Sequence, residues 1–166
     1  MSMTRIMQAV AASQGSSDLF VLLRRLMDAG PTDTLLVRQI IEPQAAAAAV
    51  SNGNGADIEA IRAAHEKALN AATLHDFEHW DAVLHRSIFA ATRNELLINL
   101  QDVLAAIREK PSWLRIKNKV ITRAVQQKYT REHGAIVEAI AARNAQAAHD
   151  AMKLHLQSVT LDMFPQ

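Results

Sequence analysis

The chain has 166 residues, with 30 Ala but only 5 Gly, 4 Pro, 7 aromatic residues and no Cys. This length suits one domain, and the composition favours helices and argues against a β-sandwich or barrel, which needs β-branched and aromatic residues. The lack of Cys excludes disulfides and thiolate metal ligands, and a net charge of +1 lacks the basic excess of a self-sufficient nucleic-acid-binding domain.

The N-terminal part of the chain is weakly patterned up to a Gln-Gly-Ser-Ser sequence. We expect residues 1–17 to form a lead-in and residues 18–166 to form the domain. The first amphipathic pattern spans residues 18–28, and the second follows Asp33. Pro43 should kink or break this second helix, because it removes one intrahelical hydrogen bond.

The Gly- and Asn-rich residues 51–55 are the clearest loop, and neither side of it could bury a sizeable core alone. The helices predicted after it span residues 57–72 and 74–92, a segment from the N-cap Asn94 to Pro111, a long pattern up to Arg143, and residues 145–163. Short connections between such helices predict an all-α antiparallel bundle of about six to seven helices. No apolar run reaches the roughly 18 residues of a membrane span and no signal peptide is recognisable, so we expect a soluble, cytoplasmic protein.

Four polar residues lie on helix faces that are otherwise apolar. Asp81 and His85 are four residues apart and therefore project from one face on successive turns. His133 and His155 each continue an apolar line on a different predicted helix. Because an unpaired carboxylate on a buried face is costly, Asp81 should become neutral, pair with another group or bind a cation.

One carboxylate and three imidazoles suit Zn²⁺, Ni²⁺, Mn²⁺ or Fe²⁺ better than Ca²⁺, which prefers six to eight oxygen ligands. From spacing alone two other interpretations stay open. An inward histidine is more often a hydrogen-bonded core residue than a ligand, and Asp81 with His85 could form a buried ion pair. His65, His75, His79 and His149 occupy polar or ambiguous positions and are predicted to lie on the surface.

Arg38 also points along a core face, with Leu35, Ile41 and Ala45. It could extend its head to solvent or pair with Glu42 four residues later. Alternatively, its guanidinium could bind a ligand carboxylate or phosphate through two hydrogen bonds.

The order of these residues resembles a known family. Arg38-x3-Glu42-Pro43 is followed by Asp81-x3-His85 with Ala-Ala-Thr-x-Asn94, and then by His133-x2-Ile-x3-Ile with His155 22 positions later. Over about residues 19–159 this resembles the FCD domain, the C-terminal effector-binding domain of FadR-like GntR transcription regulators, and in particular its metal-binding branch.

The resemblance implies an all-α bundle, usually dimeric, with a central ligand and metal cavity. It implies a divalent metal ion, most often Zn²⁺ or Ni²⁺, held by Asp81, His85, His133 and His155, and a small organic acid as the effector. The family arginine that contacts the acid matches Arg38, and a family asparagine matches Asn94, although helix capping explains Asn94 equally well.

Two departures from the family concern the shape of that cavity. Leu84 stands where an aromatic residue commonly precedes the first histidine, and Arg93 stands where a small residue is usual. The resemblance also implies that DNA is bound through a winged-helix domain that residues 1–17 are too short to hold.

The sequence thus predicts a metal-dependent sensing domain of a transcription regulator, with no catalytic residues. Its rivals are a metalloenzyme acting on a small carboxylate and a metal-free dimerisation domain. Hydrolysis would need a general base, and Glu42 is the one spare carboxylate that we can place near the cavity. The basic stretch from Arg115 to Arg123 is interpreted as a solvated face and not as a DNA contact.

Overall fold

The computed structural model describes residues 16–165. Most of the predicted lead-in over residues 1–17 lies outside this range. In the described part the helices are α2 (Ser16–Met27), α3 (Pro31–Asn52), α4 (Gly55–Leu69), α5 (Leu74–Ala91), α6 (Glu95–Arg108), α7 (Pro111–Val120), α8 (Arg123–Ala141) and α9 (Ala145–Met163). No strand occurs among these residues, so the predicted all-α class is confirmed.

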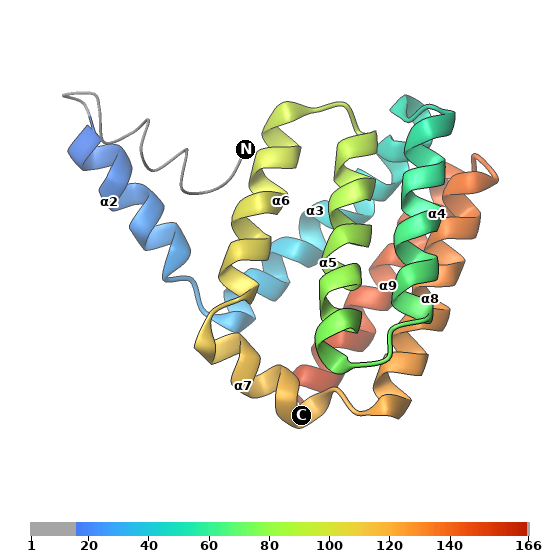
Figure 1. Ribbon diagram of the computed structural model, residues 1–166. Coiled ribbons are helices and arrows are strands. Elements are labelled where there is room, and N and C mark those ends of the chain that lie inside the picture. Colours follow the sequence, from blue (N-terminus) through green and yellow to red (C-terminus); the bar gives the residue numbers. More distant parts are fainter. Residues whose placement is uncertain (1–15, 166) are drawn as a thin grey trace.

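Helices α3 to α9 form a bundle, and α2 extends away from it (Figure 1). Figure 1 shows α4, α5 and α6 side by side, with α3 and α9 behind them and α8 beside α9. The pairs α3–α9, α4–α5 and α8–α9 pack most extensively. None of the described helices is long and apolar enough to cross a bilayer.

Three details of the helix assignment differ from expectation. Helix α3 continues through the buried Pro43, because the turns that follow it are held in the core by Ala45, Ala46 and Ala49. The loop predicted over residues 51–55 shortens to Gly53 and Asn54. The basic stretch after Pro111 forms the additional helix α7, in which that proline occupies the first turn.

Gly53 is required where α3 turns into α4. A Cβ atom at this position would lie 2.6 Å from the Ala49 carbonyl oxygen and 3.2 Å from Cβ of Ala91. The Arg143 guanidinium fixes the same turn, since its Nη1 donates to the carbonyls of Val50 and Gly53. The close approach of α3 and α5 therefore depends on the missing side chain.

Two groups of apolar side chains make up the core. The Ile88 cluster joins α3, α4, α5, α8 and α9 and includes Ile88, Ile136 and Met152. The Trp113 cluster surrounds Trp113 of α7 and includes Phe77, Tyr129 and Val159. A set of buried polar residues, which we call the charged layer, lies between the two clusters along α3, α5, α6, α8 and α9, and consists of Arg38, Glu42, Asp81, His85, Arg108, His133 and His155.

Candidate metal centre

Helical spacing places each member of the charged layer. On α5, Asp81 and His85 follow Phe77 of the Trp113 cluster by one and two turns and precede Ile88. On α8, His133 lies one turn from Tyr129 and from Ile136. The apolar residues on either side hold these helix faces inward, so the polar residues between them are forced into the core.

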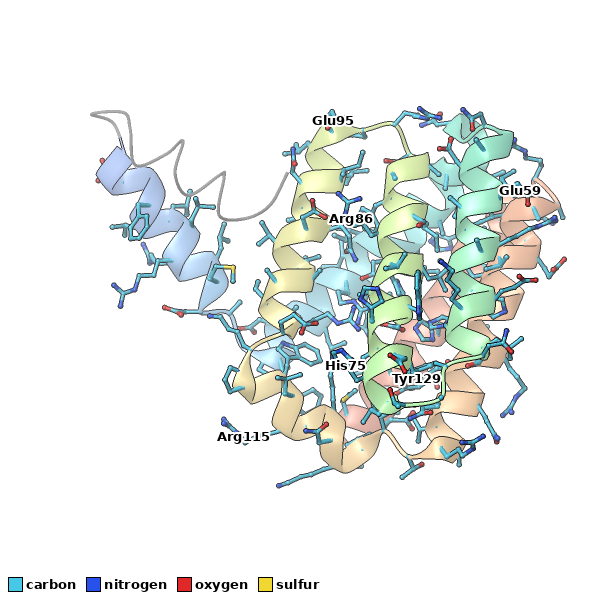
Figure 2. All side chains as sticks on the ribbon, viewed as in Figure 1. Glu59, His75, Arg86, Glu95, Arg115 and Tyr129 are labelled. Carbon is cyan, nitrogen blue, oxygen red and sulfur yellow. The ribbon has the colours of Figure 1, made fainter. Side chains whose placement is uncertain are left out.

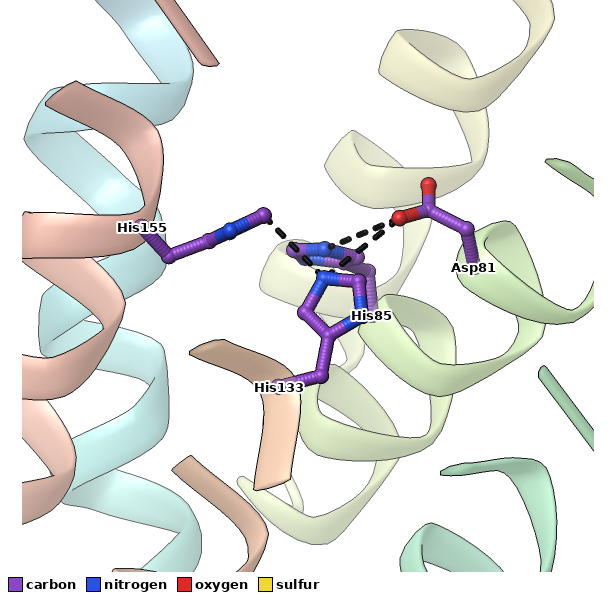
Figure 3. A group of neighbouring side chains, drawn as sticks. All are labelled: Asp81, His85, His133 and His155. Atoms are coloured by element: carbon purple, nitrogen blue, oxygen red, sulfur yellow. Dashed lines mark hydrogen bonds and ion pairs between the residues drawn. The ribbon is translucent and has the colours of Figure 1, made fainter. Parts of the chain in front are cut away.

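The structure brings together the four residues predicted as metal ligands (Figure 3). Asp81, His85, His133 and His155 are all buried, and one potential ligand atom from each lies within 4.8 Å of the others. Nε2 of His133 lies 3.1 Å from Nε2 of His155 and 3.5 Å from Oδ1 of Asp81. Nε2 of His85 lies 3.8 Å from the same carboxylate oxygen.

These separations fit the coordination sphere of a small divalent ion. Ligands at 2.0–2.1 Å from a tetrahedral Zn²⁺ are about 3.4 Å apart, and octahedral neighbours are closer, at about 2.9 Å. Nε2 of His85 is fully buried and has no hydrogen-bond partner. A buried nitrogen without a partner is rare and calls for an ion or water, so the donor set fits a metal.

Neighbouring carboxylates orient two of the histidines. Nδ1 of His85 lies 2.6 Å from Oε2 of Glu42, and Nδ1 of His155 lies 2.8 Å from Oε2 of Glu132. A ring that donates its Nδ1 proton to a carboxylate presents the lone pair of Nε2 on the other side. Nε2 of both rings therefore faces the centre of the cluster, where that of His155 contacts Nε2 of His133 and that of His85 has no hydrogen-bond partner.

Two arginines balance the buried carboxylates. Arg108 donates from Nη2 to Oδ2 of Asp81 at 2.8 Å, which leaves Oδ1 facing His85 and His133. Arg38 donates to Glu42 from Nε at 2.5 Å and from Nη2 at 3.4 Å. The layer is thus a network of ion pairs and not a set of isolated charges.

The network shifts the pKa values of its members. Burial raises the pKa of Glu42, but the Arg38 guanidinium and the adjacent His85 ring outweigh burial and hold this pKa well below its ordinary 4.5. For Asp81, burial is likewise outweighed, mainly by Arg108, and the pKa is lowered. Burial lowers the pKa of His133 and of His155, so both rings are neutral, as metal ligands must be.

The two residues predicted to bind the effector lie in different surroundings, since Arg38 is buried and Asn94 is exposed. Arg38 is buried and paired with Glu42, so it does not reach solvent, and it lines a small cavity beside the cluster. Asn94 is exposed and caps α6, with its side chain accepting from the backbone N–H groups of Leu96 and Leu97. Asn94 is not among the residues that line this cavity, and its role in ligand binding stays a prediction.

The two departures from the family pattern have different consequences. Leu84 is fully buried in the Ile88 cluster and directly precedes His85, one of the four clustered residues. Arg93 adopts a left-handed conformation with φ of 57° and is exposed, and its Nη2 donates to Asp57 at 2.6 Å. Arg93 therefore lies outside the cavity.

The other histidines and the basic stretch were predicted to lie at the surface, and some of these residues are buried or half-buried. His75 and His79 are exposed as predicted, whereas His65 and His149 are half-buried. Figure 2 shows Arg115 extending outward from α7. Lys117 contradicts the prediction of a solvated face, because it is buried against Glu78 of α5, a partner distant in sequence.

Sequence analysis did not identify Arg108, Glu132, Lys117 or Glu78 as parts of the site. Arg108 ends α6 and Lys117 lies in a short basic helix, where cations are ordinary. Of these four residues, only Glu132 could have been suspected from the sequence, because it directly precedes the predicted metal ligand His133. Arg108, Lys117 and Glu78 line a small cavity that adjoins Asp81 and His155. Trp113 and Tyr129 complete its wall. The cavity has a volume of about 10 Å³, which is roughly enough for one water molecule.

A family model of the FCD domain matches residues 33–158. The Uxu operon regulator of Haemophilus influenzae is 28% identical over 142 residues, which are 84% of this chain and 53% of that protein. The Uxu operon transcriptional regulator of Escherichia coli is 29% identical over 136 residues, which are 80% of this chain and 53% of that protein. The chain thus spans about half the length of the curated relatives that it matches.

Solved structures share the fold at low sequence identity. Escherichia coli McbR/YncC aligns with a TM-score of 0.70 and 14% identity, over 80% of this chain and 63% of that one. Streptococcus agalactiae GntR aligns with a TM-score of 0.62 and 22% identity, over 82% of this chain and 58% of that one. Both likenesses support the all-α bundle.

Replacing Glu42 by Gln should destabilise the metal-free protein strongly. The substitution leaves the buried Arg38 charge without its partner, and breaking a buried pair in this way costs about 3–5 kcal/mol. Urea denaturation in the presence of EDTA measures the free energy of unfolding. Glu59→Gln is the matched control, because its pair with Arg62 is exposed and should change stability by less than about 0.5 kcal/mol. Equal losses for the two variants would contradict the buried network.

The free energy of unfolding of the metal-free protein should decrease in two stages as the pH is lowered. The folded-state pKa values of His133 and His155 lie below the ordinary 6.5, so the unfolded chain binds more protons below that pH and unfolding becomes easier. Glu42 and Asp81, whose pKa values are also lowered, add a second loss below about pH 4.5. Urea denaturation in EDTA between pH 8 and pH 4 tests this, and a flat profile between pH 7 and pH 5 would contradict it.

Proposed function

The chain belongs to the FCD domain family, and from this premise we propose that it is the metal-dependent effector-sensing domain of a GntR-type transcription regulator. The effector is a small organic acid. The observation that carries the proposal is the convergence of one carboxylate oxygen and three imidazole nitrogens from α5, α8 and α9 in the buried core. The names of the related Uxu operon regulators support a role in transcription.

Asp81, His85, His133 and His155 would hold the ion, with Zn²⁺ or Ni²⁺ favoured by a set of nitrogen and oxygen ligands. When bound, the ion supplies a Lewis-acidic position that can accept an oxygen of the effector. Glu132 contacts Nδ1 of His155 and Glu42 lies 2.6 Å from Nδ1 of His85, so both carboxylates hold the rings with Nε2 toward the ion. Arg108 holds Asp81 so that only Oδ1 faces the ion.

The size of the adjoining cavity links binding to a change of conformation. Its volume of about 10 Å³ cannot hold an organic acid, so the surrounding helices must move apart to admit one. The cavity is walled by residues of α3, α5, α6, α7, α8 and α9, so this movement changes how the helices pack. In the whole regulator, the change would alter the arrangement of the DNA-binding parts.

The contacts of Glu42 argue against a metalloenzyme. Glu42 was the one carboxylate available as a general base, but it is fully buried, accepts from Arg38 and contacts His85. Its lowered pKa makes it a weak base. A metal-free dimerisation domain is disfavoured by Nε2 of His85 and Nδ1 of His133, because core histidines of that kind would have hydrogen-bond partners.

DNA binding and dimer formation complete the proposal. The chain matches about half the length of the related regulators, and we assign DNA contact, in the cytoplasm, to a winged-helix domain in the other half. The dimer surface would be the seam of α3 and α9, where the large apolar side chains of Leu36, Ile40 and Leu161 are more than half exposed. A hydrogen bond from Gln39 to Thr160 joins the two helices at this seam.

Zn²⁺ should stabilise the protein, and His155→Gln should abolish the effect. A ligand at 100 times its dissociation constant adds about 2.7 kcal/mol to the free energy of unfolding. Losing one ligand should weaken Zn²⁺ binding more than 100-fold, which exceeds the effect of losing an outer partner. Calorimetric titration and thermal melts with Zn²⁺ or EDTA measure both quantities.

His149→Gln is the matched control on the same helix, because His149 contacts Gln44 and Asp150 and is not one of the four clustered residues. It should bind Zn²⁺ as the wild type does. If the wild-type protein, purified without chelators, carries no metal and shows no stabilisation by Zn²⁺ or Ni²⁺, the metal-dependent mechanism is wrong.

Ile40→Asp should convert the proposed dimer into a monomer, because it places a charge in an apolar interface. Size-exclusion chromatography with light scattering measures the mass. Leu69→Asp is the control, since Leu69 is equally exposed, at 60% against 61%, but lies at the end of α4. A monomeric wild type, or a dimer that survives Ile40→Asp, would refute this surface.

A further inference from the structure

The wall of the cavity away from the histidines is made of charged groups from α5, α6 and α7. Arg108, Lys117 and Glu78 line the cavity together with Asp81. Arg108 and Lys117 are both less than 10% exposed. The two cations are close enough that Arg108 helps burial to lower the pKa of Lys117, while Glu78 opposes the shift.

Arg108 has two nitrogen donors that make no hydrogen bond. Its Nη2 is bonded to Asp81, but Nε and Nη1 are buried and have no hydrogen-bond partner. Buried N–H groups of a cation are costly to leave unpaired, so these two are available to a water molecule or to an acceptor on a ligand that displaces it. Arg38 differs, because two of its three nitrogens already bind Glu42.

The ion pair of Lys117 and Glu78 lies between this small cavity and a larger cleft. The cleft, with a volume of about 430 Å³, lies between α5 and α7 and is bounded by His75, His79 and Leu114 as well as by the pair itself. The same two side chains also line the inner cavity. An anion that displaces Glu78 from Lys117 therefore passes from the cleft to Arg108.

The charges around the cavity limit the charge of the ligand. Arg38, Arg108 and Lys117 are each paired with one carboxylate, namely Glu42, Asp81 and Glu78, so these six groups are balanced. A divalent ion adds two positive charges, of which Glu132 beside His155 offsets one. One further negative charge completes the balance, and two would leave an uncompensated charge in the core.

We propose that Arg108 and Lys117 form the subsite for the effector's carboxylate, that the effector reaches it through the cleft between α5 and α7, and that it carries a single carboxylate. This inference rests on the proposed function and replaces Arg38 by Arg108 as the residue that binds the acid. Arg38 then acts as a positioning residue that holds Glu42 against His85.

The test measures acid binding to the Zn²⁺-loaded protein by calorimetry. The probes are lactate, pyruvate and gluconate, with uncharged glucose and the dicarboxylate succinate as comparisons. The monocarboxylates should bind, whereas glucose and succinate should bind at least tenfold more weakly. Zn²⁺ affinity is measured for every variant, so that loss of the acid site is distinguished from loss of the metal.

Arg108→Lys keeps the positive charge beside Asp81 but removes the unpaired guanidinium N–H groups. Measured at a Zn²⁺ concentration that saturates the variant's own metal site, it should raise the dissociation constant of the bound acid about 10- to 100-fold, as expected for a lost charge-assisted hydrogen bond. Arg86→Lys is the matched control, because Arg86 makes a similar two-bond pair with Asp102 at the surface. It should change acid binding by less than twofold.

A double variant, Glu78→Gln with Lys117→Met, gives an independent result if Arg108→Lys does not fold. It removes both charges of the pair, so no unpaired charge is left in the core, and it should weaken acid binding about tenfold. If Arg38→Lys weakens acid binding and neither Arg108→Lys nor the double variant does, the subsite is wrong and the proposed function stands. If no acid binds the Zn²⁺-loaded wild type, the proposed function itself fails.

Discussion

Buried charge that must be paired is the constraint on which this bundle depends. A charged layer crosses the core between two apolar clusters, and removing an ion from water costs several kcal/mol unless a partner compensates it. Each cation of the layer accordingly faces one carboxylate, as Arg38 faces Glu42 and Arg108 faces Asp81. This pairing restricts how α3, α5 and α6 can be rotated about their axes, because a rotated helix would set a charge against an apolar cluster.

The same pairing prepares the candidate metal centre. Each partner occupies one side of a polar group and leaves the other side open, as Arg108 does for Asp81 and Glu132 does for His155. An apolar layer of the same shape would be as stable or more so, and thus the ion pairs are better explained by the site than by stability. His133 has no partner on Nδ1, and the polar contacts of its ring are those of Nε2 with His155 and Asp81.

Sequence reasoning found the four clustered residues because they lie on helices whose apolar neighbours define the inner face. Asp81 and His85 were recognisable from spacing, and the pair of Arg38 with Glu42 was one of the alternatives considered. Lys117 was misjudged, since a lysine among basic residues is ordinarily solvated and its partner Glu78 lies 39 positions earlier. Asn94 was ambiguous between capping and binding, and its hydrogen bonds to the start of α6 show the capping role.

The sequence by itself determined most of the helices and the inward-facing residues of α5, α8 and α9, because these follow from local periodicity and capping, but it missed α7 and the inward-facing Arg108 and Lys117. Only the tertiary structure decided which charges meet: Arg108 with Asp81, Lys117 with Glu78, and Glu132 with His155. The physical reason is that periodicity fixes the direction of a side chain about its own helix axis. The partner across the interface depends on how neighbouring helices shift and rotate against one another, and the packing of the whole core sets that arrangement.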